Sequence, residues 1–157
     1  MIPQQKIQKG KVNGWPSEVL IHTDGASRGN PGAASAGLAV YDNGKICIYE
    51  EAFLLGTKTN NFAEYSAVLR ALQLSSENKV KNLLLKSDSE FLVKQLSGLY
   101  KVKSPNIKKL YEECKKWEAE ISQVKFQHVR REQNKRADEL ANLVLDGYDI
   151  SNDTDRI

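Results

Sequence analysis

The chain has 157 residues, of which 40% are hydrophobic and 27% are charged, and its formal net charge is only +3. No apolar run approaches the roughly 20 residues of a membrane span, and residues 1–14 contain no apolar segment that suits a secretory signal. These features favour one globular domain in the cytoplasm, with no membrane partner and with Cys47 and Cys114 as reduced thiols.

The order of apolar patterns and turns predicts a mixed α/β chain. A flexible leader is expected over residues 1–17, a folded domain over 18–147 and a loose tail over 148–157. Strands are predicted at 18–24, 35–41, 45–55, 83–88 and 124–129, and helices at 60–76, 89–97, 104–120 and 133–146. Hairpins join the first three strands, whereas helices separate the later ones. We therefore predict a five-stranded mixed sheet, three antiparallel strands plus two parallel ones, with helices on both faces.

Four carboxylates lie near the ends of predicted elements, and each has an ordinary structural explanation. Asp24 fits an Asp-Gly turn, and Glu64 fits a capping box with Asn61. Asp88 suits a helix N-cap, and Asp138 suits the first turn of a helix, where the dipole favours a negative charge. Taken one at a time, these acids require no chemistry.

A capping role does not fully explain Glu64, because this residue follows the spacing of the apolar residues on the buried face of the helix. Together they form a stripe that consists of Glu64, Ala67, Val68, Ala71 and Leu72. An ionised side chain facing the sheet is costly unless something compensates it. Acids crowded at the carboxyl ends of strands also raise one another's pKa values unless a cation neutralises them. Carboxylate oxygens select hard divalent cations, so the pattern predicts a site for Mg²⁺ or Mn²⁺.

Basic residues are unevenly spread along the chain. Lysines recur from Lys79 to Lys116, and Arg130, Arg131, Lys135 and Arg136 form a later cluster. Such runs are either solvated faces or surfaces that neutralise nucleic-acid phosphates, and the charge pattern alone leaves both open.

Four segments together resemble the type 1 ribonuclease H family. They are Thr23-Asp24-Gly25-Ala26-Ser27 with Gly29-Asn30-Pro31-Gly32, Thr59-Asn60-Asn61-Phe62-Ala63-Glu64, Ser87-Asp88-Ser89, and Arg131-Glu132-x-Asn134-x-x-Ala137-Asp138-x-Leu140-Ala141. The resemblance extends from about Glu18 to Leu145. It implies a ribonuclease H-like fold and an endonuclease that hydrolyses the RNA strand of RNA–DNA hybrids.

The resemblance also implies a mechanism. Two divalent ions, Mg²⁺ with Mn²⁺ as a substitute, would lie about 4 Å apart and serve in-line attack on a phosphate. The acids expected to hold them are Asp24, Glu64, Asp88 and Asp138. Asp24 would bridge both ions, and the products would carry 5′-phosphate and 3′-hydroxyl ends.

Further positions match the substrate contacts of the family. Those matching contacts to the RNA strand and its 2′-hydroxyls are Gly25, Ala26, Asn60, Asn61 and Glu64. Asn30 and Thr59 match positions that hold a DNA phosphate, although a turn residue and a helix cap explain them equally well. Glu90 stands where many members carry a glutamine that contacts RNA, which predicts a weaker or altered contact there.

The chain resembles the compact archaeal and bacterial members that lack a basic handle and a loop with a catalytic histidine. His128 is expected to be a structural strand residue, and Arg131 is a candidate for an electrostatic role near the scissile phosphate. Lys101, Lys103, Lys108 and Lys109 either replace part of the handle surface or are solvated. A monomer is expected. Activity on double-stranded RNA, a silent nucleic-acid-binding module and another nuclease of the superfamily stay open as alternatives.

Overall fold

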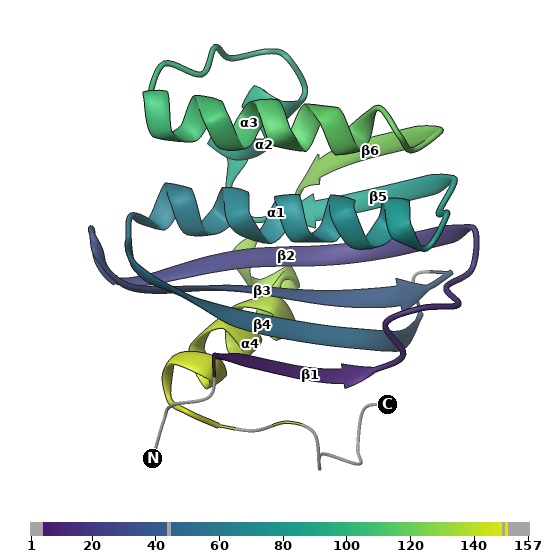
Figure 1. Ribbon diagram of the computed structural model, residues 1–157, viewed down its shortest axis with the longest axis horizontal. Coiled ribbons are helices and arrows are strands. Elements are labelled where there is room, and N and C mark those ends of the chain that lie inside the picture. Colours follow the sequence, from purple (N-terminus) through teal and green to yellow (C-terminus); the bar gives the residue numbers. More distant parts are fainter. Residues whose placement is uncertain (1–4, 44, 149, 151–157) are drawn as a thin grey trace.

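The computed structural model of the protein describes residues 5–43, 45–148 and 150. Within these residues six strands form one sheet, in the order β1-β4-β3-β2-β5-β6, with helices on both faces (Figure 1). The strands are β1 Lys6–Gly10, β2 Glu18–Gly29, β3 Gly32–Asp42, β4 Ile46–Lys58, β5 Asn82–Ser87 and β6 Gln123–His128. The helices are α1 Asn60–Glu77, α2 Glu90–Leu96, α3 Pro105–Glu118 and α4 Lys135–Leu145, and a 3₁₀ turn at Arg131–Gln133 precedes α4.

The pairing confirms the predicted mixture of antiparallel and parallel strands. β2, β3 and β4 form an antiparallel meander, whereas β5 pairs in parallel with β2, and β6 in parallel with β5. The predicted count of five strands is wrong, because β1 adds a sixth strand at the edge beside β4. β1 lies inside the segment expected as a flexible leader. Only Ile7 in this strand is a buried apolar residue, so the alternation of apolar and polar residues is too short to recognise in the sequence. The strand forms nevertheless, because its backbone pairs with β4.

Strand β2 is longer than the sequence predicts. Its apolar residues end before Asp24, but the backbone pairing with β3 continues to the Gly29↔Gly32 pair. Asp24 therefore lies within a strand, opposite Gly37, and not in an Asp-Gly turn. Ladder hydrogen bonds do not need apolar side chains, which explains why the pattern missed the last five residues.

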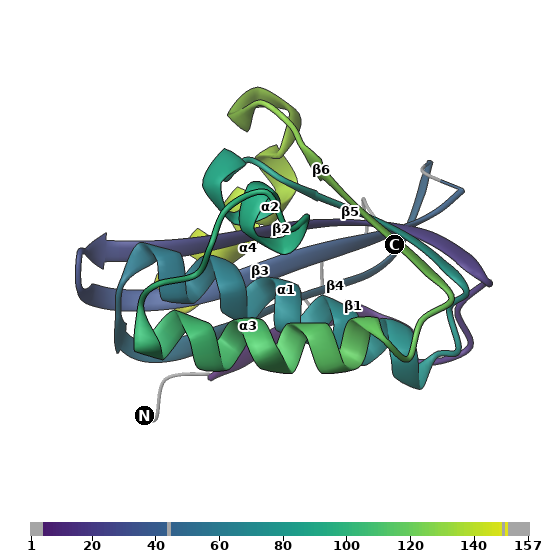
Figure 2. The same ribbon diagram turned by 90° about the horizontal axis from the view of Figure 1, so that it is seen from above.

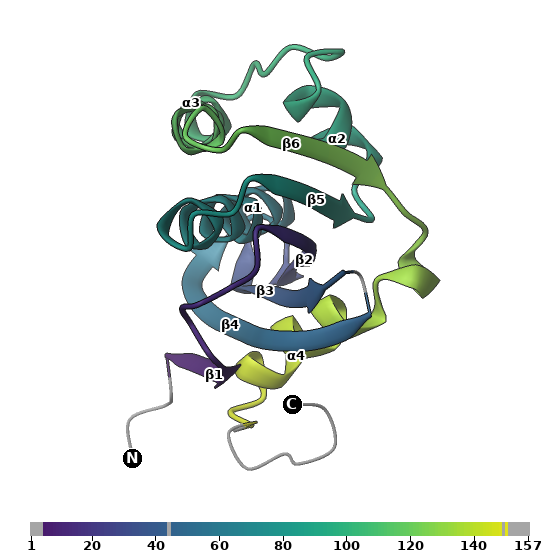
Figure 3. The ribbon, with the colours of Figure 1, turned by 90° about the vertical axis from the view of Figure 1, so that its right-hand side faces the viewer.

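The helices divide between the two faces of the sheet (Figure 3). Helix α1 packs on β2 and β3 and is covered on its outer side by α3, which runs alongside it (Figure 2). Helix α4 packs on the other face, against β2, β3 and β4. Because α1 is enclosed by both the sheet and α3, it is buried well beyond the single stripe that the sequence predicted.

Gly25 allows helix α1 to approach the sheet closely. A Cβ at this position would lie 2.3 Å from backbone atoms of Ala63 and Glu64, a contact that no side chain can tolerate. The absence of a side chain at Gly25 thus brings the helix that carries Glu64 against the strand that carries Asp24.

Gly37 does the same for helix α4 on the opposite face. A Cβ here would lie 2.8 Å from the carbonyl oxygen of Ala137 and 2.9 Å from the amide nitrogen of Ala141. Gly37 is paired with Asp24 across the β2–β3 ladder, and Ala137 directly precedes Asp138. Two glycines beside Asp24 therefore bring both acid-bearing helices close to it.

The ends of the chain are only partly described. Residues 1–4 of the expected leader, and residue 149 and residues 151–157 of the expected tail, lie outside the described residues. Ile150 is buried in a cluster with Ile7, Ala39 and Leu140. Among the described residues, none of the helices combines the length and apolar character that crossing a membrane requires.

Candidate active site

The four predicted acids line one open cavity of about 360 Å³. Its walls come from β2, the start of α1, the end of β5, the turn before α4 and α4 itself. The lining residues are Asp24, Gly25, Ala26, Ser27, Arg28, Asn60, Glu64, Asp88, Arg131, Asp138 and Asn142. Segments more than 100 residues apart in the chain thus meet where the sequence predicted a site.

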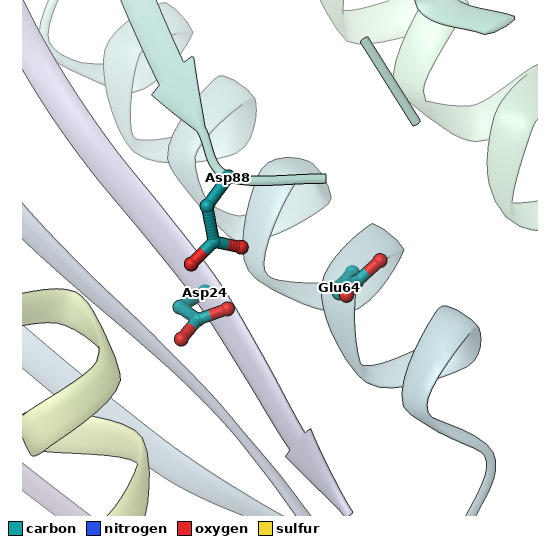
Figure 4. A group of neighbouring side chains, drawn as sticks. All are labelled: Asp24, Glu64 and Asp88. Carbon is teal, nitrogen blue, oxygen red and sulfur yellow. The ribbon is translucent and has the colours of Figure 1, made fainter. Parts of the chain in front are cut away.

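Three of the acids lie close enough to share a cation. Carboxylate oxygens of Asp24, Glu64 and Asp88 all lie within 4.8 Å of one another. Figure 4 shows the three side chains, carried by β2, by α1 and by the segment that follows β5. An all-oxygen set of this kind suits a hard divalent ion.

The ordinary explanations for Glu64 and Asp88 do not hold. Helix α1 is capped by Thr59, whose side chain accepts a hydrogen bond from the Phe62 amide, so Glu64 lies beyond the capping positions. Helix α2 is capped by Ser89 and not by Asp88. Both carboxylates are therefore held in the cavity without serving the ends of their helices.

Burial and mutual repulsion disfavour negative charge at this site. Burial, followed by the charges of Asp88 and Asp138, raises the pKa of Asp24 to about 9. Burial also raises the pKa of Glu64, where the charge of Asp88 adds to the effect. The pKa of Asp88 is raised by burial, although a hydrogen bond from the Asn134 side chain opposes the rise. Burial and the mutual repulsion of the acids thus favour their protonated forms, and no ion pair between described residues joins Asp24, Glu64 or Asp88 to a basic side chain.

Asp138 lies on the same cavity wall, in the first turn of α4, outside the group of three. The Asn142 amide donates to its backbone carbonyl at 2.9 Å and approaches its carboxylate at 3.4 Å. The Arg131 guanidinium lies 4.0 Å from the same carboxylate, with 81% of its side chain exposed. Arg131 is therefore free to reach an anion at the rim.

The predicted substrate contacts divide into two groups. Gly25, Ala26, Asn60 and Arg131 line the cavity with the acids, and the Asn60 amide donates to Glu64 at 2.8 Å. The others lie outside this lining. Asn61 lies in a neighbouring hollow formed with Phe91 and Tyr100, and Thr59 in a groove beside α3.

Asn30 and Glu90 also lie outside the cavity lining. The Asn30 side chain accepts a hydrogen bond from the Asn60 backbone amide at 3.1 Å, which ties the β2–β3 turn to the start of α1. Glu90 is exposed and pairs with Lys94 at 2.7 Å.

Sequence reasoning gave no role to three polar residues of the cavity, Ser27, Arg28 and Asn142. Arg28 shares a face of β2 with Asp24, and Asn142 follows Asp138 by one helical turn, so both spacings were readable once the acids had been chosen. Arg28 pairs with Asp146 at 2.8 Å and thereby links the end of β2 to the end of α4.

His128 ends β6 and is exposed. It lies near enough to Asp88 for its charge to lower the pKa of that acid slightly against the larger effect of burial. The expected role as a structural strand residue stays a prediction.

Similar proteins point to the same site and fold. A family described as "Reverse transcriptase-like" matches residues 22–144. The ribonuclease HI of Halobacterium salinarum is 34% identical over 128 residues, which cover 82% of this chain and 64% of that protein. The "Bifunctional protein Rv2228c" of Mycobacterium tuberculosis is 34% identical over 131 residues and also matched over 82% of this chain, but the match spans only 36% of its length.

Solved structures extend the likeness to the fold. The crystal structure of the ribonuclease H1 from Halobacterium salinarum has a TM-score of 0.79 at 33% identity, covering 82% of this chain and 98% of that one. LC11-RNase H1, solved in complex with an RNA/DNA hybrid, has a TM-score of 0.77 at 37% identity, covering 82% and 96%. Sheet order, helix placement and the acidic cavity together define a ribonuclease H-like domain.

The chain belongs to the ribonuclease H family, in the group described as reverse transcriptase-like. The resemblance drawn from its four sequence segments is confirmed.

Proposed function

We propose that this protein is an endoribonuclease that hydrolyses the RNA strand of RNA–DNA hybrids. The observation that carries the proposal is the group of Asp24, Glu64 and Asp88, with oxygens within 4.8 Å and no cationic partner among the described ion pairs, in a member of the ribonuclease H family. Relatives named ribonuclease H, and a neighbour solved with an RNA/DNA hybrid, support the choice of substrate.

The cofactor we propose is Mg²⁺, with Mn²⁺ as a substitute, held as two ions by Asp24, Glu64, Asp88 and Asp138. When bound, divalent ions supply an activated water and neutralise charge that develops on the attacking and leaving oxygens. The chain's own contribution is to hold the carboxylates rigidly: Asp24 within a paired strand, Glu64 on a helix enclosed from two sides. The expected products carry 5′-phosphate and 3′-hydroxyl ends.

The residues around the acids fit strand discrimination. Gly25 and Ala26 place backbone groups on the cavity wall, and the Asn60 amide lies beside Glu64, so donors and acceptors surround the position of a ribose 2′-hydroxyl. We place the RNA strand over this wall. Asn61 borders the neighbouring hollow. Thr59 caps α1, and the Asn30 side chain reaches the start of α1 from the β2–β3 turn, so we place the DNA strand over these two residues.

Arg131 is proposed to contact the phosphate next to the scissile bond. Its guanidinium borders the acidic cavity and is mostly exposed, so it can bind an anion without first leaving a buried partner. Replacing Arg131 by alanine should lower kcat on hybrid by roughly tenfold, the effect of losing one charge-assisted hydrogen bond. Unchanged turnover would remove this role.

The experiment uses three labelled substrates of one sequence: an RNA–DNA hybrid, single-stranded RNA and double-stranded RNA. Wild-type protein is compared with Asp24→Asn in Mg²⁺, in Mn²⁺ and in excess EDTA. The proposal predicts metal-dependent cutting of the hybrid by wild type alone. Cutting that persists in EDTA or in Asp24→Asn contradicts the metal site, and equal cutting of all three substrates contradicts the hybrid specificity.

Double-stranded RNA as a second substrate, a monomeric state and a cytoplasmic location stay predictions. So does the domain assignment of residues 18–147, to which strand β1 adds residues 6–10.

A further inference from the structure

Asn134 connects three of the acid-bearing segments. It directly precedes α4 and is 1% exposed, and its backbone carbonyl accepts the Asp138 amide at 3.2 Å. Its side-chain nitrogen donates to the carbonyl of Thr23 at 2.9 Å, next to Asp24. The same side chain also hydrogen-bonds to the Asp88 carboxylate. One buried amide therefore joins β2, the end of β5 and the start of α4.

The orientation of this amide follows from its partners. The Thr23 carbonyl can only accept, so the Asn134 atom that faces it must be the nitrogen. The Asn134 oxygen then faces the Nδ1 atom of His22 at 3.1 Å. Two acceptors cannot bond to each other, so His22 must carry its proton on Nδ1 and donate it.

His22 is itself held firmly. It lies within β2, opposite Ala39, and its ring contacts the Tyr41 ring edge-on, with centroids 5.4 Å apart. The imidazole therefore presents a fixed donor to Asn134. Without that donor the Asn134 oxygen would be buried with no hydrogen-bond donor, and the amide would no longer be held in its present orientation.

We propose that His22 is a positioning residue for the acidic site, which acts by fixing the Asn134 amide so that its nitrogen faces Thr23 and Asp88. His22 lies on the face of β2 that also carries Leu20 and Asp24, two residues to either side, and it is not among the residues that line the cavity. Its influence reaches the acids through Asn134. The inference rests on the metal site of the proposed function and deepens it.

The consequence is an effect on metal affinity and not on substrate binding. Groups that hydrogen-bond to ligating carboxylates typically change metal affinity by about 10-fold to 100-fold when they are removed. Because His22 acts through a second residue, we expect the lower end, about 10-fold weaker binding for His22→Phe. The phenylalanine ring keeps the aromatic contact with Tyr41 and removes only the donor.

His22→Asn is the conservative variant. An asparagine amide nitrogen occupies nearly the position of a histidine Nδ1, so it can donate to Asn134 in the same direction. Leu20→Ala is the matched control, because it removes packing from the same strand and face, two residues away, without touching Asn134.

The measurement is the Mn²⁺ dissociation constant of the full chain without nucleic acid, from electron paramagnetic resonance of free Mn²⁺. It is accompanied by the ¹⁵N-resolved side-chain signals of Asn134 and by KM for the hybrid. We expect weaker Mn²⁺ binding and altered Asn134 signals in His22→Phe, near wild-type values in His22→Asn and in Leu20→Ala, and an unchanged KM in all three.

Two results with the His22 variants would overturn the inference: wild-type Mn²⁺ affinity in His22→Phe, or the same loss in His22→Asn as in His22→Phe. Equal weakening in Leu20→Ala would also overturn it, since general loosening of β2 would then be the cause. These outcomes are separate from the proposed function. A wild type that binds Mn²⁺ through His22-dependent positioning but leaves hybrids intact would refute the nuclease activity alone.

Discussion

Buried and partly buried acids gather in two neighbouring regions of this fold, and their surroundings differ in the cations that they supply. On β4, Glu50 and Glu51 are both fully buried, and each is paired with an arginine. On β2 and its neighbours, Asp24, Glu64 and Asp88 converge without a cationic partner among the described ion pairs. The paired acids of β4 serve the fold. The unpaired acids around Asp24 leave negative charge that a bound cation can neutralise.

The pKa directions express this difference. Burial raises the pKa of Glu51, but hydrogen bonds from Arg70 and Tyr49 outweigh it, so the pKa is lowered overall. Arg70 donates to this carboxylate through Nε at 2.7 Å and a terminal nitrogen at 3.0 Å, and Lys6 adds a second cation at 3.2 Å. At Asp24 burial and neighbouring acids act in the same direction, and the pKa rises to about 9. Burial of an acid alone is therefore not evidence of a metal site. Burial of an acid that has no basic side chain beside it is such evidence.

Asp24→Asn should produce the largest effect. We expect hybrid cleavage to fall by at least about 1,000-fold, as the loss of an essential group in a cooperative site does. The unfolding free energy without metal should not fall, since burial and the neighbouring acids already favour the neutral form of Asp24, which asparagine resembles. Single-turnover cleavage and denaturant unfolding of the same preparation measure both.

Glu51→Gln should lower stability and leave hybrid cleavage unchanged, which is the reverse of the result expected for Asp24→Asn. Breaking a buried ion pair costs about 3–5 kcal/mol, and we expect the lower value because 26% of the Arg70 side chain stays exposed. Activity per folded molecule should stay near wild type. Glu120→Gln, at an exposed position, is the control and should change stability little. If Glu51→Gln abolished cleavage in folded protein, the division between fold and site would be wrong.

Gly37→Ala tests the close approach of α4. The added Cβ would meet the Ala137 carbonyl at 2.8 Å, so the helix must shift away from the strand. We expect a loss of about 1–3 kcal/mol from overpacking, together with weaker metal binding as Asp138 moves. Thermal unfolding and a Mn²⁺ titration check the two effects, and an unchanged melting temperature would show that α4 adjusts without strain.

The dependence of stability on pH should separate the two regions again. The pKa of Asp24 is higher in the folded state than its ordinary value of 3.8, so the folded state binds the proton more tightly. Its contribution is present in full below 3.8 and is lost as pH rises toward about 9.

Metal-free protein should therefore lose stability across that range, by at most about 1.4 kcal/mol per pH unit for each proton. The contribution of Glu51 to stability changes with pH in the opposite direction. Because the pKa of Glu51 is lowered in the folded state, its contribution is lost as pH falls. Urea unfolding at several pH values, with EDTA and with Mg²⁺, measures the effect. A metal-free protein that became more stable toward pH 9 would contradict it.

His128→Ala should have the smallest effect. The side chain is exposed at the end of β6, so we expect a change in stability within about 0.5 kcal/mol. Hybrid cleavage should stay close to wild type at saturating metal. A large fall in kcat would show that this imidazole reaches the reaction after all.

The sequence revealed the site better than it revealed the strands that frame it. Four motifs carried the acids, and the helical spacing of Glu64 turned it toward the sheet, where it lines the cavity with Asp24 while remaining partly exposed. The edge strand β1 escaped notice because Ile7 is its only buried apolar residue, and the end of β2 escaped because its polar residues pair through the backbone. Local patterns record which side chains are buried, but they do not record which backbones pair.

Long-range contacts were equally hidden. Nothing in the local pattern links His22 to Asn134, which lie 112 residues apart, or shows that Gly37 faces α4. The pairing of Glu50 with Arg136 spans 86 residues. The sequence therefore pointed to the acids that the fold brings together in the candidate site, whereas the residues that support them became visible only in the folded structure.

The central claim is that a cation replaces protons at the acidic cluster. Calorimetric titration of Mn²⁺ into metal-free protein at pH 7.5, repeated in buffers of different ionisation enthalpy, measures protons released per ion bound. The account predicts saturable binding with net proton release, and loss of both in Asp24→Asn but not in Glu51→Gln. Binding without proton release, or binding that survives in Asp24→Asn, would contradict it.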